Sequence, residues 1–238
     1  MLYLTRRMPL SNENHGRKKS LTKPALTVQL AVTAAKDFGI AERDHQEPDL
    51  YGTTDGKAVG TYLEQKFRRY LLDRYDFHSG NSAEGIDIPG LGLDFKTTSI
   101  KQPQSSCPFK SARQKVYGLG YSLLVFVYDK SDDHVLRTAT LDIKHVIFVE
   151  KERTADFQTT TSLLSILANS GNEDDLAAYL LDRRLPLDDI QAAKLAAEIM
   201  RTPPLVGYLT ISNALQWRLQ YKRVIDQAGT VDGVTRIL

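Results

Sequence analysis

The segment YSLLVFVYD, residues 121–129, constrains the fold more than any other, because it is apolar almost without interruption. A run of this kind is typical of a strand that is buried on both sides, whereas a half-exposed strand alternates apolar and polar residues. The next segment, VLRTATLDIKHVIFVE, predicts two further strands or one bent strand. Together these pieces predict a mixed central sheet.

Two segments before this strand have the spacing of helices. Residues 24–40 predict a first helix, with Gly39 marking its end. Residues 57–75, KAVGTYLEQKFRRYLLDRY, predict a second, amphipathic helix. Its apolar stripe consists of Val59, Leu63, Phe67 and Leu71. We therefore expect an α/β (α+β) fold in which helices flank the mixed sheet.

Beyond Lys151 the pattern changes, and three successive segments have helical spacing. They cover residues 159–171, 172–184 and 185–202, and Pro203 and Pro204 end the run. Asn172 and the acidic pair after Leu187 are placed as helix starts. We expect a mainly helical C-terminal lobe, with a soft boundary near residue 155. After the prolines, residues 205–212 predict a short strand.

Composition excludes several classes of site and of protein. A single cysteine, Cys107, excludes an internal disulfide framework and a cysteine-rich zinc site, and the thiol is expected to be inert. The five histidines show no paired metal spacing, and no glycine-rich loop binds a nucleotide cofactor. No run is long enough to span a membrane and no secretory signal is present, so we expect a cytoplasmic protein.

The segment IDIPGLGLDFKTTSI, residues 86–100, carries the chemistry. Its alternation predicts a strand with two different faces, and Asp94 and Lys96 share one of them. Asp87 lies at the end of the preceding strand or turn. Neighbouring carboxylates are tolerated best around a hard cation such as Mg²⁺, whose bound water can attack a phosphodiester. A lysine can orient that water and offset charge on the phosphate. The alternative for Asp94 and Lys96 is an exposed cross-strand pair.

The stretch from Asp87 to Thr97, DIPGLGLDFKT, resembles the PD-(D/E)xK nuclease superfamily, and within it the MutH-like branch. That branch also has a helix of the pattern V-G-x-x-L-E, which residues 59–64 match. The resemblance covers about residues 55–128. It implies a restriction-endonuclease-like fold. From the pattern along the chain, we expect residues 1–45 to form a basic N-terminal arm and helix, residues 46–155 the catalytic core, and residues 156–238 a helical C-terminal lobe with terminal strands that reads DNA.

Carried over by position, the resemblance makes Asp87 and Asp94 ligands of Mg²⁺ and Lys96 the lysine that orients water. Glu64 becomes the helix-borne acid that supports the metal or the lysine, although it could instead be a surface glutamate. One departure is Asp94, where this branch often has glutamate. A further basic residue often follows the core, and Lys110, Arg113 or Lys115 could fill that place or be a plain solvated cation.

Two other segments could contact DNA. Residues 215–222, LQWRLQYK, would expose a row of polar side chains if they formed a strand. Glutamine and arginine side chains can form paired hydrogen bonds with the edges of adenine and guanine. That row consists of Gln216, Arg218, Gln220 and Lys222. The alternatives are an edge strand with a plain polar face, or a helix over 212–227 that leaves only Arg218 and Lys222 together. Residues 6–23 hold six basic residues against Glu13, as an arm near phosphates or a solvated tail would.

The leading hypothesis is a type II restriction endonuclease, a Mg²⁺-dependent deoxyribonuclease that cuts double-stranded DNA at a defined sequence and leaves 5′-phosphates. A methylation-directed nicking enzyme of mismatch repair is the first alternative. A DNA-binding protein that does not cleave is the second. A palindromic target would favour a homodimer, but some enzymes of this branch act as monomers.

Overall fold

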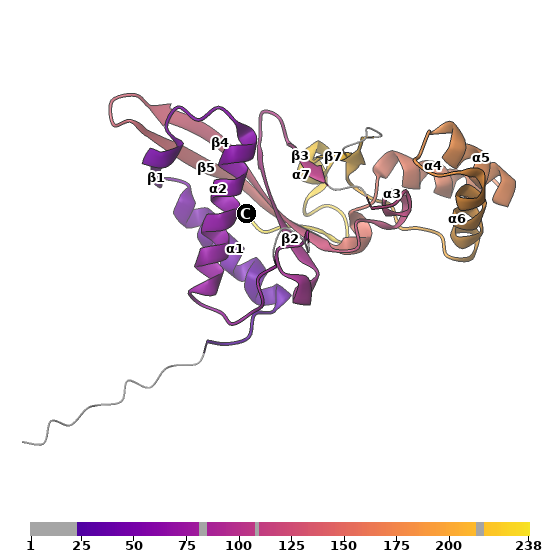
Figure 1. The fold of residues 1–238 in the computed structure, drawn as a ribbon, viewed down its shortest axis with the longest axis horizontal. Coiled ribbons are helices and arrows are strands. Elements are labelled where there is room, and N and C mark those ends of the chain that lie inside the picture. Colours follow the sequence, from indigo (N-terminus) through magenta and orange to yellow (C-terminus); the bar gives the residue numbers. More distant parts are fainter. Residues whose placement is uncertain (1–22, 81–84, 108–109, 213–216) are drawn as a thin grey trace, which may run out of the picture.

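The computed structural model describes residues 23–80, 85–107, 110–212 and 217–238. Its main sheet has the strand order β1-β5-β4-β2, and β8 also pairs with β5 (Figure 1). The strands are β1 (Gln46–Glu47), β2 (Leu93–Ser99), β4 (Ser122–Asp133), β5 (Thr138–Val149) and β8 (Val234–Arg236). Strand β2 runs parallel to β4, and the other pairs are antiparallel. The prediction of a mixed sheet is confirmed.

Of the two alternatives predicted for the segment VLRTATLDIKHVIFVE, two strands or one bent strand, the structure has the second, which is β5. Its pairing with β4 runs from Thr138 to Ile143 in one register and from His145 to Val149 in another. Lys144 is the extra residue between these two stretches, so it forms a β-bulge that bends the strand. The bend lets β1 and β8 pair with separate ends of the same edge of β5.

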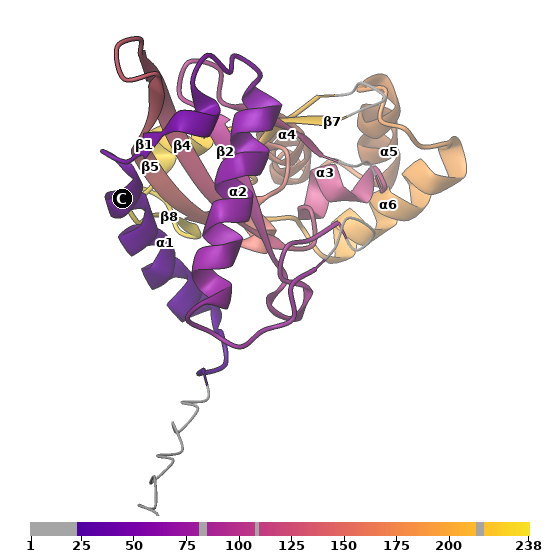
Figure 2. The same cartoon turned by 60° about the vertical axis from the view of Figure 1, so that its left-hand side comes forward.

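The two faces of the sheet pack against different layers. Helices α1 (Val28–Glu42) and α2 (Gly56–Leu72) cover one face, where Leu124 and Phe126 of β4 join their apolar stripes (Figure 2). The other face carries Leu123, Val125 and Val127 of β4. It packs against a second sheet, in which β7 (Trp217–Gln220) lies between β3 (Gln104–Cys107) and β6 (Thr210–Ile211), and against α7 (Lys222–Gln227). Strand β4 is therefore buried on both sides, as its composition predicts.

The first helix does not end at Gly39, and that prediction was wrong. Helix α1 continues to Glu42, and Gly39 lies within it. A Cβ atom at Gly39 would come within 2.9 Å of Val146 Cγ2 and 3.1 Å of Leu238 Cδ2. The glycine therefore allows the helix to approach β5 closely and has no role in ending the helix.

The helical segments after residue 155 form their own apolar cluster. They are α4 (Phe157–Ala168), α5 (Glu173–Asp182) and α6 (Asp189–Arg201), which lie together with the short α3 (Arg113–Tyr117) in Figure 1. Asn172 and Asp188 cap α5 and α6 as predicted, each within a capping box. Helix α6 ends before Pro203. The domain boundaries given above stay a prediction.

The segments after the prolines are shorter than predicted. The second sheet consists of β3 (Gln104–Cys107), β6 (Thr210–Ile211) and β7 (Trp217–Gln220), so only two residues of 205–212 are in a strand. Strand β7 covers part of the predicted strand 215–222, and helix α7 starts at Lys222, which rules out one helix over the whole of 212–227. The basic residues before Lys23 lie outside the described residues. Within the described ranges, no helix is long and apolar enough to cross a membrane.

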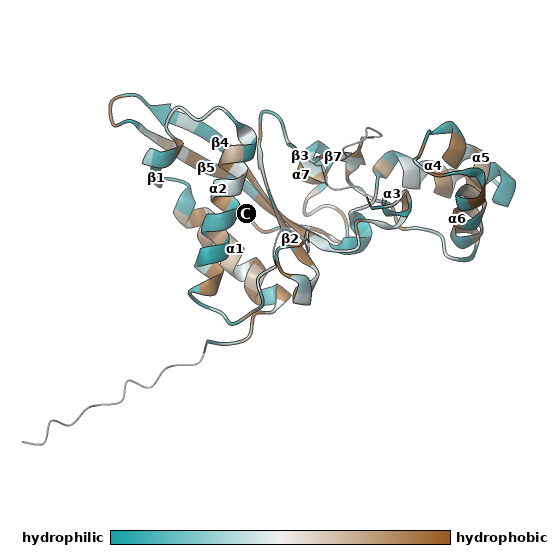
Figure 3. Cartoon of the chain, in the orientation of Figure 1, coloured by the Kyte–Doolittle hydropathy of each residue, from teal (hydrophilic) through white to brown (hydrophobic). Residues whose placement is uncertain are grey.

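Colouring by hydropathy shows the same organisation. In Figure 3 the central strands are largely brown, which marks hydrophobic residues, and teal hydrophilic stretches lie on the outside of the helices. Short 3-10 helices connect several elements, at Pro48–Leu50, Pro89–Leu91 and Lys151–Arg153. The second of these leads directly into β2, where the candidate catalytic residues lie.

Candidate active site

Strand β2 lies at the edge of the main sheet, and carboxylates occupy the side away from β4. The amide of Phe95 donates a hydrogen bond to Asp87 Oδ2 at 2.7 Å. Two residues later, the amide of Thr97 donates to Glu64 Oε1 at 2.8 Å. Within the described residues no further strand pairs with this edge. The two acids therefore satisfy backbone donors that a neighbouring strand would otherwise satisfy.

A tight turn places Asp87 beside β2. Ile88 and Leu93 form an isolated antiparallel bridge, and the 3-10 helix Pro89–Leu91 closes the loop between them. Gly92 has a φ of 54°, in the left-handed region that glycine adopts without strain. The DIPGLG segment thus folds back on itself and returns Asp87 to the level of Phe95. The predicted strand begins only at Leu93, so Leu91 belongs to the turn.

Helix α2 supplies two side chains to the same edge. Glu64 and Arg68 are one turn apart, and residues four apart share a helix face. The Arg68 guanidinium forms an ion pair with Asp87, whose side chain is 12% exposed. Arg68 was not predicted from the sequence as a site residue. Its position four residues after Glu64 was the only signal, and that signal has no meaning until the partner Asp87 is placed.

Asp94 and Lys96 lie on one face of β2, as the alternation predicts. Asp94 Oδ2 is 2.6 Å from Lys96 Nζ, and their side chains are 5% and 18% exposed. In the parallel register they neighbour Leu123 and Val125 of β4, whose side chains belong to the cluster beneath the second sheet. The pair is therefore enclosed between the two sheets and does not form an exposed surface pair.

The carboxylates of this site are difficult to ionise together. Burial raises the pKa of Asp94 to about 6, Lys96 opposes the increase, and Asp87 adds to it. Burial likewise raises the pKa of Glu64 to about 7, again against Lys96 and with Asp87 and Asp94. Burial alone would lower the pKa of Lys96, but Asp94 and other neighbours raise it overall. Three carboxylates thus share the site with two cations, Lys96 and Arg68, so one negative charge stays unbalanced when all three are ionised.

The carboxylate oxygens of the site are of the kind that a hard divalent cation prefers as ligands. Asp94 Oδ2 is buried and, although it is ion-paired with Lys96, it has no hydrogen-bond donor in a favourable direction among the described residues. Within those residues, no three His, Cys, Asp or Glu side chains form a ready ligand set. A Mg²⁺ ion typically takes one or two carboxylates and keeps several waters, so Asp87 and Asp94 would be enough as its protein ligands.

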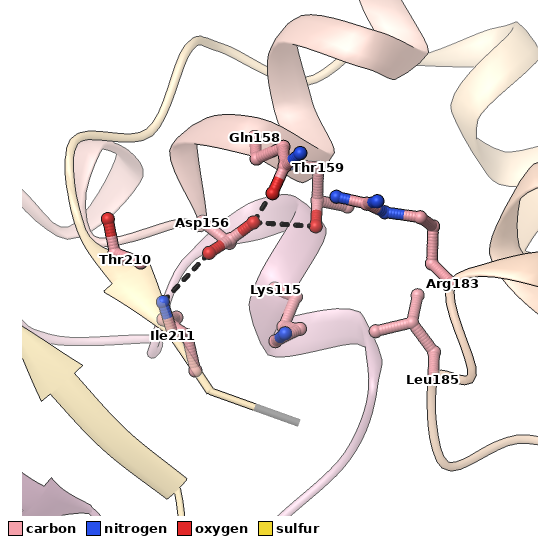
Figure 4. A pocket seen from close by; sticks show the side chains of 8 residues that line it. All are labelled: Lys115, Asp156, Gln158, Thr159, Arg183, Leu185, Thr210 and Ile211. Carbon is pink, nitrogen blue, oxygen red and sulfur yellow. Dashed lines mark hydrogen bonds between the residues drawn. The ribbon is translucent and has the colours of Figure 1, made fainter. Parts of the chain in front are cut away.

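The three basic candidates after the core have different surroundings. Lys110 is exposed, and Arg113 forms a forked ion pair with Glu198 of α6. Lys115 is only 3% exposed and lines a cavity of about 150 Å³ between α3, α4 and β6 (Figure 4). Burial lowers the pKa of Lys115, Asp156 opposes this, and Arg183 adds to it. Lys115 is thus enclosed by the helical part of the molecule.

The polar row of 215–222 is partly present. Arg218 and Gln220 are exposed on β7 and alternate with the buried Leu219 and Tyr221. Lys222 does not continue the row, because it starts α7 and pairs with Asp226 four residues on. Gln216 lies outside the described residues. Two of the four predicted base-reading residues therefore share the outer face of one strand.

Comparison with known proteins gives one family for nearly the whole chain. The family model described as type II restriction enzyme NspV matches residues 25–236. The type II restriction enzyme NspV of Nostoc sp. (strain ATCC 29411 / PCC 7524) is 63% identical over 212 residues, which cover 89% of this chain and 96% of the relative. No solved structure matches the chain. All the residues of the site described above lie within the matched region.

Proposed function

Because the chain belongs to the NspV family of type II restriction enzymes, we propose that it is a magnesium-dependent endonuclease of the PD-(D/E)xK superfamily. Family membership confirms the prediction of a sequence-specific restriction endonuclease acting on double-stranded DNA, in preference to a repair nickase or a non-cleaving binder. The observation that carries the catalytic proposal is the edge of β2. There Asp94 and Lys96 form an ion pair, and Asp87 and Glu64 accept hydrogen bonds from the amides of the neighbouring Phe95 and Thr97.

In this proposal Asp87 and Asp94 hold the Mg²⁺ ion. Such an ion would supply Lewis-acid chemistry, because it would polarise the scissile phosphate and lower the pKa of the attacking water. Lys96 Nζ, held by Asp94, donates hydrogen bonds to that water or to a phosphate oxygen and offsets the developing negative charge. The attack expels the 3′ oxygen and leaves a 5′-phosphate.

The other polar residues of the site orient this group. Glu64 fixes the amide of Thr97, the residue next to Lys96, and so holds the strand on which the lysine is carried. Arg68 fixes the carboxylate of Asp87 from the side of α2. Neither side chain is proposed to accept a proton from water. They keep the strand and the turn at the spacing that the reacting groups need.

Exposed Arg218 and Gln220 are proposed to contact base edges, and Lys110 to contact a phosphate. Recognition of a palindromic site would be achieved by a twofold dimer. Light scattering of the protein with and without a duplex that contains its site tests this proposal. One protomer per duplex would contradict it.

Metal removal is expected to abolish cleavage. A plasmid of known sequence should yield discrete fragments in buffer with Mg²⁺ and remain intact in EDTA, and added Mg²⁺ should restore the fragments. Mg²⁺ should also raise the free energy of unfolding by roughly 1 to 3 kcal/mol, because it binds the folded site. That stabilisation, measured by thermal denaturation, should be lost in Asp87→Asn. Equal stabilisation of both proteins would contradict the proposed ligand.

A further inference from the structure

The second sheet has an outer face of polar side chains that spans all three of its strands. Gln220 of β7 lies opposite Gln104 of β3 in the antiparallel register. Two positions away, Arg218 lies opposite Ser106. On the other side of β7, Thr210 of β6 is also paired with Gln220. Directly opposed residues of an antiparallel pair project to the same face, so the five side chains form one surface.

The burial of the strands agrees with this assignment. Four of the five side chains are exposed, and Gln104 is half-buried. Residues that alternate with them, such as Leu219 and Ile211, are buried in the apolar cluster beneath the sheet. In Figure 1, β3 and β7 lie between the main sheet and the helices after residue 155. The polar face therefore points to solvent, where a ligand can reach it.

The chemistry of this face suits the edges of bases in DNA. A glutamine amide both donates and accepts, and an arginine donates two parallel hydrogen bonds. Glutamine can bind N6 and N7 of adenine, and arginine can bind O6 and N7 of guanine, and all of these atoms face the major groove. Of the residues described on this face, none is acidic, so no carboxylate there repels the phosphates.

The dimensions of the sheet also fit a groove. Strands β3 and β7 have four residues each, and β6 adds only two. The major groove is about 12 Å wide and admits a two-stranded ribbon. Arg218 and Gln220 are two positions apart, which is about 6.8 Å along a strand. Since base pairs are stacked about 3.4 Å apart, these two side chains reach base pairs one or two steps apart.

Strand β3 is also fixed to the strand that carries the catalytic pair. Strand β2 ends at Ser99, and β3 begins at Gln104. The Thr98 hydroxyl lies within hydrogen-bonding distance of the carbonyls of Gln102, at 3.3 Å, and Gln104, at 3.2 Å. Thr98 is two positions after Lys96 on β2. A base contact from β3 would therefore have a fixed offset from the lysine, as cleavage at a defined position in a site requires.

We propose that β3 and β7 enter the major groove together, and that Gln104 is a further specificity-determining residue. It contacts an adenine in the base pair that Gln220 reads or in the next one, and Arg218 contacts a guanine one or two steps away. This inference rests on the proposed function, in which Arg218 and Gln220 contact base edges. It adds a second strand to the reading surface and orders the contacts along the duplex.

The test is an analogue scan of a duplex that contains the mapped cleavage site. Each adenine in turn is replaced by 7-deazaadenine, which lacks N7 but still pairs with thymine. The single-turnover rate of the parent protein in Mg²⁺ should fall by about 5- to 20-fold at each contacted adenine. Gln104→Ala should cut the unmodified duplex about 10- to 100-fold more slowly, and one of these adenines should become insensitive to the analogue. At the others, the two losses should multiply.

Two further variants complete the scan. Gln104→Glu keeps the shape of the side chain but loses the donor to N7, so it should lose sensitivity at the same adenine. Arg218→Ala should become insensitive to 7-deazaguanine at a guanine one or two steps from that adenine. Thermal midpoints within a few degrees of the parent value establish that the variants are folded.

Gln29→Ala is the matched control, because Gln29 is exposed on α1, which covers the opposite face of the main sheet. It should cleave like the parent protein and keep every sensitivity. The inference is overturned if Gln104→Ala cleaves at the parent rate or if every adenine stays sensitive in it. Sensitivity that is lost only in Gln220→Ala would overturn the role of Gln104 and leave the proposed function standing. A parent protein that cuts no DNA in Mg²⁺ would overturn the proposed function, and this inference with it.

Discussion

Replacing Asp94 with asparagine is expected to lower the rate of DNA cleavage by about 1000-fold or more, which corresponds to roughly 4 kcal/mol of transition-state stabilisation. The change keeps the shape of the side chain but removes its negative charge. It therefore removes a proposed Mg²⁺ ligand and the group that holds Lys96 Nζ at 2.6 Å. Single-turnover digestion of supercoiled plasmid measures the effect.

The fold should survive this substitution. Burial and Asp87 outweigh Lys96 and raise the pKa of Asp94 overall, so the fold disfavours the charged form and a neutral side chain there costs little stability. The thermal midpoint in EDTA should therefore fall by no more than a few degrees, and binding of DNA should persist. This separation of binding from cleavage distinguishes a catalytic residue from a structural one.

Asp142→Asn is the matched control for charge. Asp142 lies on β5 and is 39% exposed, and its partner Lys144 is two residues away, as Lys96 is from Asp94. Each substitution removes one negative charge that lies two positions before a lysine. Asp94 is within the site, and Asp142 is outside it. Asp142→Asn should leave cleavage unchanged. A similar loss in both variants would show that the effect has nothing to do with the edge of β2.

Replacing Asp156 with alanine is expected to lower the free energy of unfolding by roughly 3 to 5 kcal/mol. Asp156 is 4% exposed, and its Oδ1 accepts hydrogen bonds from the amide and the hydroxyl of Thr159 (Figure 4). Its Oδ2 accepts from the amide of Ile211 on β6. The loss of a helix cap costs about 1 kcal/mol, and each buried donor left without an acceptor costs about 1 to 3 kcal/mol more.

Chemical denaturation measures the loss for Asp156, and a second cap gives the comparison. Asp188 caps α6 in the same way but is exposed, so Asp188→Ala should cost only about 1 kcal/mol. Asp156→Asn should fall between the two, because its oxygen can still cap α4 whereas its amide nitrogen cannot accept from Ile211. Equal losses for Asp156→Ala and Asp188→Ala would contradict the role given to β6.

Sequence periodicity was sufficient for the parts of the site that depend on local geometry. Asp94 and Lys96 are two positions apart, so any strand there places them on one side. Likewise, the uninterrupted apolar run of β4 predicted a strand with a layer on each face, which the two core clusters confirm. Glu64 was placed by resemblance to a family, and its helix followed from the stripe of apolar residues.

The rest depended on contacts between distant segments. The role of Arg68 can be recognised only when its partner Asp87, 19 positions later in the chain, is known to lie beside it. Lys115 looks like any surface lysine in the sequence, yet the helices after residue 156 cover it. Glycine is common both at helix ends and where a helix packs closely against another element. Gly39 was predicted to be the first case, but it is the second, because it lies against β5. Local patterns do not distinguish such cases, since the deciding neighbour lies far along the chain.

The two carboxylates along β2 also bear on how copies of the protein behave at high concentration. An open strand edge is a template on which another chain can add, and natural proteins use charge to prevent such growth. Here the amides of Phe95 and Thr97 are already occupied by Asp87 and Glu64, so an incoming strand finds negative charge in place of donors. Asp87 and Glu64 therefore also oppose the addition of another strand along β2.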